Sequence, residues 1–146
     1  MRALLQRVLS ANVQIDGQVV GEIGEGLLIL VCAQPEDTEL ISQRMLEKIL
    51  KLRIFSDANG KMNESVLDRQ GELLIVSQFT LIADVSRGNR PSYIGAAPPD
   101  IARTLYNTFV TQARLSGLRV ATGQFGANMQ ISLVNDGPVT IPISMN

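Results

Sequence analysis

The sequence of 146 residues contains no histidine. This absence removes the imidazole that acts as general base in Ser-His-Asp and Cys-His hydrolases, and it removes the commonest metal-binding side chain of proteins. Histidine-dependent hydrolases and histidine-ligated zinc sites are therefore excluded. If the chain is an enzyme, its proton transfers must involve other groups.

Cysteine and long apolar segments are also scarce. Cys32 is the single cysteine and lies within the apolar segment 27–33, so no internal disulfide can form and we expect a buried structural thiol. No segment approaches the roughly 18 apolar residues of a membrane span, and the N-terminal residues alternate polar and apolar without the apolar core of a signal peptide. We therefore expect a cytoplasmic protein that does not span a membrane.

The composition and the periodicity of the sequence indicate one domain over residues 1–146. Apolar residues make up 45% of the chain, and neither a linker nor a repeat interrupts it. Strands and two helices do not alternate strictly, so we expect an α+β domain with mixed, largely antiparallel sheets. The expected strands cover about 2–9, 12–15, 27–33, 72–82, 118–122, 128–134 and 138–144, with a hairpin turn at Asp16-Gly17 and helices after Pro35 and from Pro98 to Gly117.

The charge is small overall but unevenly distributed. The net charge of −1 argues against a protein that coats nucleic acid broadly. Residues 84–120 nevertheless carry a net charge of +3, from Arg87, Arg90, Arg103, Arg114 and Arg119 against Asp84 and Asp100. Such a patch could contact a few phosphates of a nucleic-acid end. Solvated arginines on a helix and a loop would give the same pattern.

Two polar segments interrupt strands that packing alone would keep apolar. Ser77-Gln78-Phe79-Thr80-Leu81 follows the buried strand 73–76, and Asn135-Asp136-Gly137-Pro138-Val139-Thr140 separates two expected strands. A ligand could satisfy their polar groups. The structural alternatives are a strand end whose side chains bond to water and a turn, since Asn, Asp, Gly and Pro favour turns. In a continuing strand, Gln78 and Thr80 would share one face and Phe79 would lie on the other.

These two segments resemble the signature motifs of the D-aminoacyl-tRNA deacylase family, also called D-tyrosyl-tRNA deacylases. The similarity extends along the chain through Arg7-Val8, Gly26-Leu27-Leu28, Lys61-Met62-Asn63, Arg90-Pro91-Ser92-Tyr93 and Phe125-Gly126-Ala127-Asn128-Met129. Cys32 departs from the glycine or other small residue expected there, which concerns packing only. The resemblance implies an α+β fold whose mixed sheets form a barrel-like core with two packed helices.

The resemblance also implies an activity. Members hydrolyse the ester of tRNA charged with a D-amino acid, or with glycine, including glycine mischarged on tRNA-Ala, without a metal or an organic cofactor. They bind the 3′ end of aminoacyl-tRNA as homodimers with two active sites near the interface. The resemblance assigns catalysis to Gln78, Phe79 and Thr80, substrate binding and chirality selection to Ser77, Met129, Gly137 and Pro138, and support of a cis Gly-Pro loop to Arg7.

The chemistry of the residues leaves two mechanisms open. An aminoacyl ester is reactive, so backbone N–H groups of Phe79 and Thr80 that stabilise the oxyanion would suffice for catalysis. Without an adjacent base the Thr80 hydroxyl is a poor nucleophile, which favours activation by the substrate's own 2′-hydroxyl over a covalent role for Thr80. A non-catalytic RNA-binding or interaction domain of the same fold, and an esterase that ignores tRNA, remain alternatives.

Overall fold

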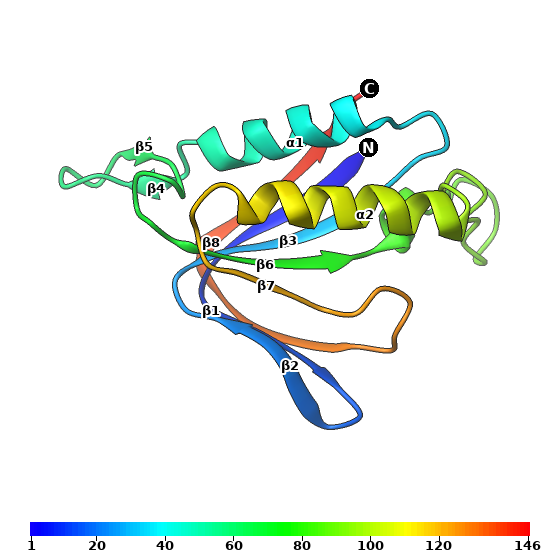
Figure 1. Ribbon diagram of the computed structural model, residues 1–146, viewed down its shortest axis with the longest axis horizontal. Helices are drawn as coiled ribbons and strands as arrows, with labels where there is room; N and C mark the ends of the chain where they lie inside the picture. Colours follow the sequence, from blue (N-terminus) through cyan, green and yellow to red (C-terminus); the bar gives the residue numbers. More distant parts are fainter.

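The computed structural model describes residues 1–146, arranged as a curled mixed sheet with two helices on one face (Figure 1). The elements follow in the order β1 (Arg2–Ile15), β2 (Gln18–Ile23), β3 (Gly26–Cys32), α1 (Glu39–Lys51), β4 (Phe55–Ser56), β5 (Met62–Glu64), β6 (Glu72–Ser77), the 3₁₀ helix η1 (Phe79–Ile82), α2 (Pro99–Arg114), β7 (Val120–Thr122) and β8 (Gln130–Ser144). None of the helices is long and apolar enough to cross a lipid bilayer.

Strand β1 lies at the centre of the sheet and pairs along both edges. One edge carries β3 beside its first half and β2 beside its second half, and the other edge carries β8, all antiparallel. Beyond β3 the strands β6 and β7 follow in parallel. The sheet is therefore mixed, as expected from the order of elements.

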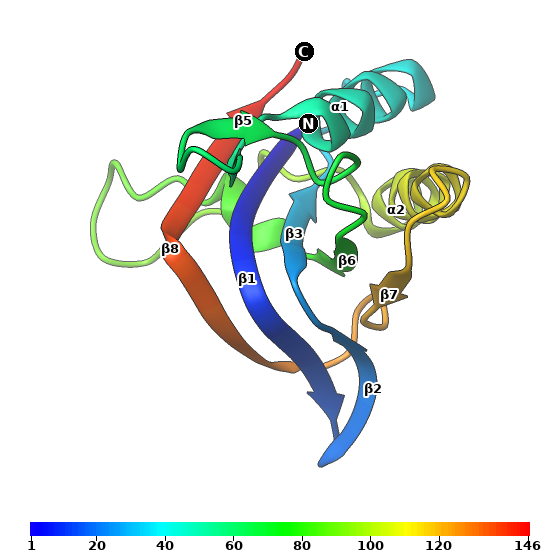
Figure 2. The same ribbon diagram turned by 90° about the vertical axis from the view of Figure 1, so that its left-hand side faces the viewer.

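The sheet curls until β2 approaches β7, which gives the nearly closed barrel-like core that the resemblance implies (Figure 2). At this approach a Cβ atom on Gly21 would lie 2.7 Å from the carbonyl oxygen of Thr122. Only glycine allows two backbones to come this close. Closure of the sheet thus depends on this residue type.

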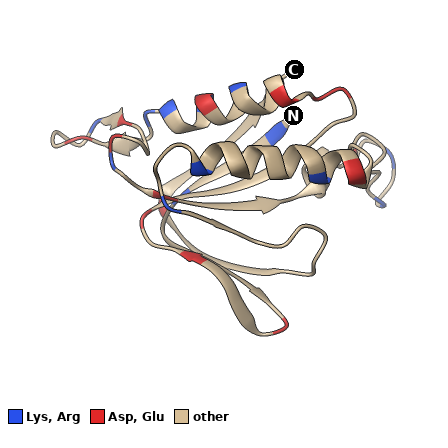
Figure 3. Ribbon diagram, in the orientation of Figure 1, with Lys and Arg blue, Asp and Glu red and all other residues tan.

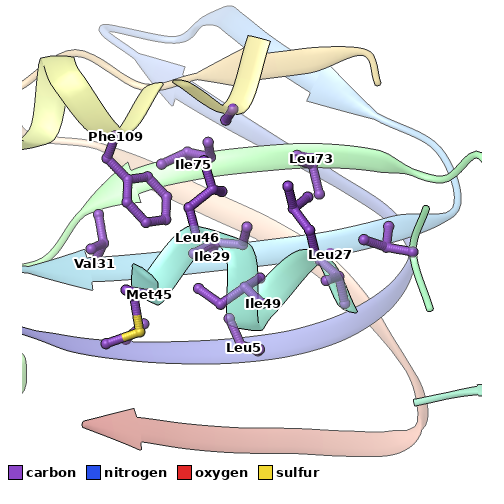
Figure 4. Packing of buried hydrophobic residues seen from close by; sticks show 14 of the residues in the cluster. Leu5, Leu27, Ile29, Val31, Met45, Leu46, Ile49, Leu73, Ile75 and Phe109 are labelled. Atoms are coloured by element: carbon purple, nitrogen blue, oxygen red, sulfur yellow. The ribbon is translucent and has the colours of Figure 1, made fainter. Parts of the chain in front are cut away.

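The two helices bury their apolar faces against one side of the sheet. Figure 4 shows strand residues such as Leu27, Ile29 and Ile75 directed towards Met45 and Phe109 of the helices. The alternate residues of the same strands point the other way and fill the interior of the curl. This second cluster comprises Val8, Ala11, Val13, Ile23, Leu28, Leu74 and Val76. Strands β3 and β6 are therefore buried on both faces, as their apolar sequences predict.

Several local expectations are confirmed and others are wrong. The hairpin turn forms with positive φ at Asp16 (50°) and Gly17 (76°), as a primed turn requires. The expected strands 2–9 and 12–15 are instead one continuous strand, because β1 keeps a partner along its whole length. Ile101 stands at helical spacing with Leu105 and Phe109 of the second helix, which predicts that it shares their buried face, but it is 41% exposed.

The backbone of the two polar segments also differs from the sequence-based expectations, which are a continuing strand for the first segment and a turn for the second. The strand expected over 72–82 ends at Ser77, and Phe79–Ile82 forms a 3₁₀ helix, so the prediction of alternating faces for Gln78, Phe79 and Thr80 is wrong. The strands expected at 128–134 and 138–144 are one strand, β8, which passes through segment 135–140 without reversing. The expected turn is therefore a bulge within a strand.

Candidate functional site

A cavity of about 710 Å³ opens where β3 and β6 end, beside the first turns of α2. Its lining is mainly apolar. Of the residues singled out in the sequence, Ser77, Gln78, Phe79 and Met129 line it, whereas Thr80, Arg7, Gly137 and Pro138 do not. The first polar segment and Met129 are therefore brought together, and the second segment lies elsewhere.

The chain changes from strand to 3₁₀ helix at Gln78. Its backbone N–H donates to the carbonyl of Val31 (2.8 Å), which ends the pairing with β3. Its side-chain amide donates to the hydroxyl of Thr80. The N–H groups of Phe79 and Thr80 begin the 3₁₀ helix, where no preceding turn offers a carbonyl, and neither donates a hydrogen bond within the chain. Both backbone donors are thus free to bind a ligand.

The wall near this turn is aromatic and sulfur-containing. The ring of Phe79 is 58% exposed and meets the edge of Tyr93, with centroids 5.1 Å apart and an interplanar angle of 72°. The thiol of Cys32 lies 3.6 Å from the carbonyl oxygen of Phe79. Burial, followed by the charge of Asp37, raises the pKa of the Cys32 thiol. Cys32 is the buried thiol that the sequence predicts, and its protonated form is a weak nucleophile.

The second polar segment forms a bulge opposite Arg7. The register pairs Val8 with Asn135 and Gln6 with Thr140, so residues 136–139 face Arg7 alone. Asn135 closes the neck of the bulge: its side chain donates to the Thr140 hydroxyl (2.8 Å) and accepts from the N–H of Val139 (2.9 Å). Within the bulge, the Gly137–Pro138 peptide bond is cis and both residues are exposed.

Arg7 fixes the base of the bulge from the core side. The side chain of Arg7 is 10% exposed, and its Nε donates to the carbonyl of Asp136 (3.1 Å) and lies 3.2 Å from the Asp136 carboxylate. Its Nη1 donates to the carbonyl of Ile54 (2.6 Å). The buried guanidinium of Arg7 thus bonds to Asp136 in the bulge and to Ile54 in the segment that follows α1, and it ties these two parts of the chain together.

The bulge and the cavity of one chain are well separated. Ser77 is level with Ala3 through Val31, whereas the bulge is level with Arg7. Four residues along a strand span about 13 Å, and the β8 residue that lines the cavity, Ile131, lies five positions before Asp136. The Gly137-Pro138 loop therefore does not line the cavity of its own chain.

The arginines of residues 84–120 form two groups rather than one patch. Arg103 lies in the first half of α2, whose first turn lines the cavity, whereas Arg114 is the last residue of the helix. Figure 3 shows basic positions, in blue, also in the loop at the cavity end of α2, within the segment of the chain that carries Arg87 and Arg90. Arg119 follows the other end of α2 and pairs with Glu72 (2.8 Å). Only the first group is near the cavity.

Sequence reasoning missed part of the cavity wall. Tyr93 and Ile94 line it from a loop, and Ile94 is 92% exposed. Apolar side chains in a loop rich in Gly and Pro are the signal that could have indicated them. Phe125, which composition alone assigns to the core, is only half-buried and also lines the cavity. No group of three or more Cys, Asp and Glu side chains is placed to hold a metal ion.

Comparison with known proteins now identifies the family. The family described as D-Tyr-tRNA(Tyr) deacylase matches residues 4–144. The chain belongs to the D-aminoacyl-tRNA deacylase family. The D-aminoacyl-tRNA deacylase of Variovorax paradoxus (strain S110) is 62% identical over 145 residues, covering 99% of each chain, and that of Azoarcus sp. (strain BH72) is 59% identical over 143 residues, covering 98% of this chain and 95% of the relative.

Solved structures share the fold of this chain. A structure titled c-Myc DNA Unwinding Element Binding Protein superimposes with a TM-score of 0.93 at 42% identity, covering 99% of this chain and 98% of the other. A probable eukaryotic D-amino acid tRNA deacylase superimposes with a TM-score of 0.85 at 18% identity and 97% coverage of each chain, which shows the shared fold. Deacylases of this family are hydrolases that act on ester bonds.

The contacts of Arg7 generate a stability prediction. In Arg7→Lys a single ammonium replaces a planar group with five donors, so it cannot serve Ile54 and Asp136 at once. We expect the free energy of unfolding, measured by urea titration, to fall by about 2 kcal/mol. The control is Arg53→Lys at an exposed arginine, which should change stability by less than about 0.5 kcal/mol. Equal stability of the two variants would contradict the bridging role of Arg7.

Proposed function

We propose that this chain hydrolyses the ester of D-aminoacyl-tRNA to free tRNA and a free D-amino acid, in the cytoplasm where aminoacyl-tRNA is used. Membership of the deacylase family supports the substrate class. The observation that carries the proposal is the pair of unbonded N–H groups of Phe79, which lines an apolar cavity, and of its chain neighbour Thr80. Such donors suit the oxyanion of an ester's tetrahedral intermediate.

The proposed mechanism needs no side-chain nucleophile. Because the amide of Gln78 donates to the Thr80 hydroxyl, that hydroxyl oxygen already accepts a hydrogen bond, and donation from an amide does not increase its nucleophilicity. The Cys32 thiol is held protonated by burial. We therefore assign activation of the attacking water to the 2′-hydroxyl of the terminal ribose, with Phe79 and Thr80 stabilising the oxyanion through their backbones.

We further propose that the enzyme is a homodimer in which the Gly137-Pro138 loop of one subunit enters the cavity of the other. The loop is exposed, lies on the edge strand β8 and is fixed by Arg7 and Asn135, and it does not reach the cavity of its own chain. A rigid loop can exclude an L side chain by occupying its space. This loop is the proposed chirality filter.

Glycine should escape such a filter. A loop that recognises where a side chain points has nothing to exclude on a glycyl ester, and Met129 and Ser77 in the cavity offer no obstacle specific to it. We therefore include glycyl-tRNA, with glycine mischarged on tRNA-Ala, among the proposed substrates. No metal or organic cofactor takes part in the proposed reaction.

The first prediction concerns the reaction itself. Purified protein should hydrolyse D-tyrosyl-tRNA with many turnovers and leave L-tyrosyl-tRNA largely intact, because the filter rejects the L side chain. The measurement is release of labelled tyrosine from the two substrates at equal concentration. Equal rates on both would remove the chirality claim. Binding of tRNA without turnover would favour a non-catalytic RNA-binding domain, and equal hydrolysis of small esters would favour a general esterase.

The second prediction separates the two possible roles of Thr80. Since its backbone N–H survives substitution, Thr80→Ala should keep kcat for D-tyrosyl-tRNA within about tenfold of wild type. Replacing the terminal 2′-hydroxyl of the substrate by hydrogen should reduce kcat by about 100-fold or more, the range of general acid-base catalysis. An inactive Thr80→Ala that coexists with normal cleavage of the deoxy substrate would instead support a covalent role for Thr80.

The third prediction concerns the loop. Gly137 has φ of +129°, and a Cβ there would lie 3.0 Å from Nη2 of Arg7 and 2.9 Å from Cγ2 of Val139. Gly137→Ala should therefore displace the loop and reduce the ratio of D- to L-tyrosyl-tRNA hydrolysis by about tenfold or more. Gly60→Ala is the matched control, since Gly60 also has positive φ (+77°) but open space around it. A Gly137→Ala enzyme that discriminates like the control would contradict the proposed filter.

A further inference from the structure

We propose that Arg103 binds a backbone phosphate of the single-stranded 3′ end of the substrate tRNA, and that Phe125 holds its guanidinium at the mouth of the cavity. This inference rests on the proposed function for the identity of the substrate. Arg103 is a positioning residue in this account, because a phosphate lies outside the reacting ester.

A series of aromatic contacts connects Arg103 to the core. Its Cζ lies 4.9 Å from the centroid of the Phe125 ring, within the range of a cation–π interaction. The Phe125 ring lines the cavity and lies 5.9 Å from the ring of Tyr106. Tyr106 is buried and donates its hydroxyl hydrogen bond to the carbonyl of Ile75 (2.9 Å). The guanidinium is thus placed by a contact network that begins in strand β6.

The same guanidinium has no protein partner for its charge. Arg103 is exposed, and it takes part in none of the ion pairs or side-chain hydrogen bonds of the chain, although Asp100 lies one turn earlier on α2. Stacking on a ring leaves the N–H donors at the edge of the guanidinium free. Arg119, by comparison, is occupied by Glu72. A free, oriented arginine beside an apolar cavity is well suited to a phosphate.

The position of Arg103 determines which part of the substrate it can contact. If the aminoacyl group fills the cavity, the terminal nucleotide and its phosphate lie outside it, and Pro98 and Pro99 at the start of α2 are among the residues that line the cavity. The loop at that end of α2 also carries basic residues, coloured blue in Figure 3. The 3′ end of tRNA is single-stranded, and proteins bind such strands through arginine contacts that depend strongly on salt.

The test compares Arg103→Gln with Arg114→Gln, which removes the same charge at the far end of α2. We expect Arg103→Gln to raise KM for D-tyrosyl-tRNA about fivefold to tenfold with kcat within about twofold. It should also reduce the slope of log(kcat/KM) against log[salt] by about 0.7, the value for one phosphate of a single strand. Arg103→Lys, which keeps the charge but not the planar stacking, should give an intermediate KM.

Two further measurements separate this inference from the proposed activity. The effect of Arg103→Gln should vanish on D-tyrosyl-adenosine, an ester substrate without a phosphate. It should persist in the binding of uncharged tRNA, measured by fluorescence anisotropy, whether or not the protein hydrolyses esters. Equal behaviour of Arg103→Gln and Arg114→Gln towards tRNA would overturn the phosphate site. An equal loss on the phosphate-free substrate would also overturn it, since Arg103 would then act on the cavity itself.

Discussion

Backbone pairing along both edges of β1 sets the positions of the strands that carry the two polar segments. β3 on one edge carries β6 and the turn at Gln78, and β8 on the other edge carries the bulge. Since side chains alternate along a strand, a slip of one residue would turn Leu5 and Val8 out of their two clusters. It would also separate Arg7 from Asp136. Core packing and site geometry therefore depend on the same register.

The sequence predicts the elements whose structure is determined by burial of apolar residues. The prediction is wrong where the local conformation depends on residues that are distant in the sequence. Apolar residues at helical spacing after Pro35, among them Met45 and Ile49, predict α1, and the apolar run before Ser77 predicts β6. The sequence does not predict the 3₁₀ helix after Gln78, because this helix forms where β6 has no further neighbouring strand. Since β3 ends at Cys32, the backbone of residues 79–82 forms hydrogen bonds within its own turn instead of with β3. No feature of residues 79–82 reports where a neighbouring strand ends.

The bulge illustrates the same limit of local patterns. Asn135 to Pro138 are turn-forming residues, and their composition gives no sign that the strand continues beyond them. The decisive contacts come from Arg7, which lies 129 positions away in sequence from Asp136. The family resemblance predicts that Arg7 supports the Gly137-Pro138 loop, but which atoms of Arg7 and Asp136 form the contact is known only from the folded structure. Likewise Phe125 reads as a core residue until α2 places Arg103 against its ring.

The separation of the cavity from the bulge has a physical rationale under the proposed function. A cavity that accepts many side chains must be wide and apolar, as this one is, whereas a loop that rejects one stereoisomer must be rigid and polar at its backbone. Arg7 and Asn135 supply rigidity through hydrogen bonds to the carbonyl of Asp136 and from the N–H of Val139, while Arg7 is itself tied to Ile54. Bringing the loop from the free edge of β8 in a second subunit satisfies both requirements with one fold. In the proposed dimer, the loop of one subunit would complete the cavity of the other.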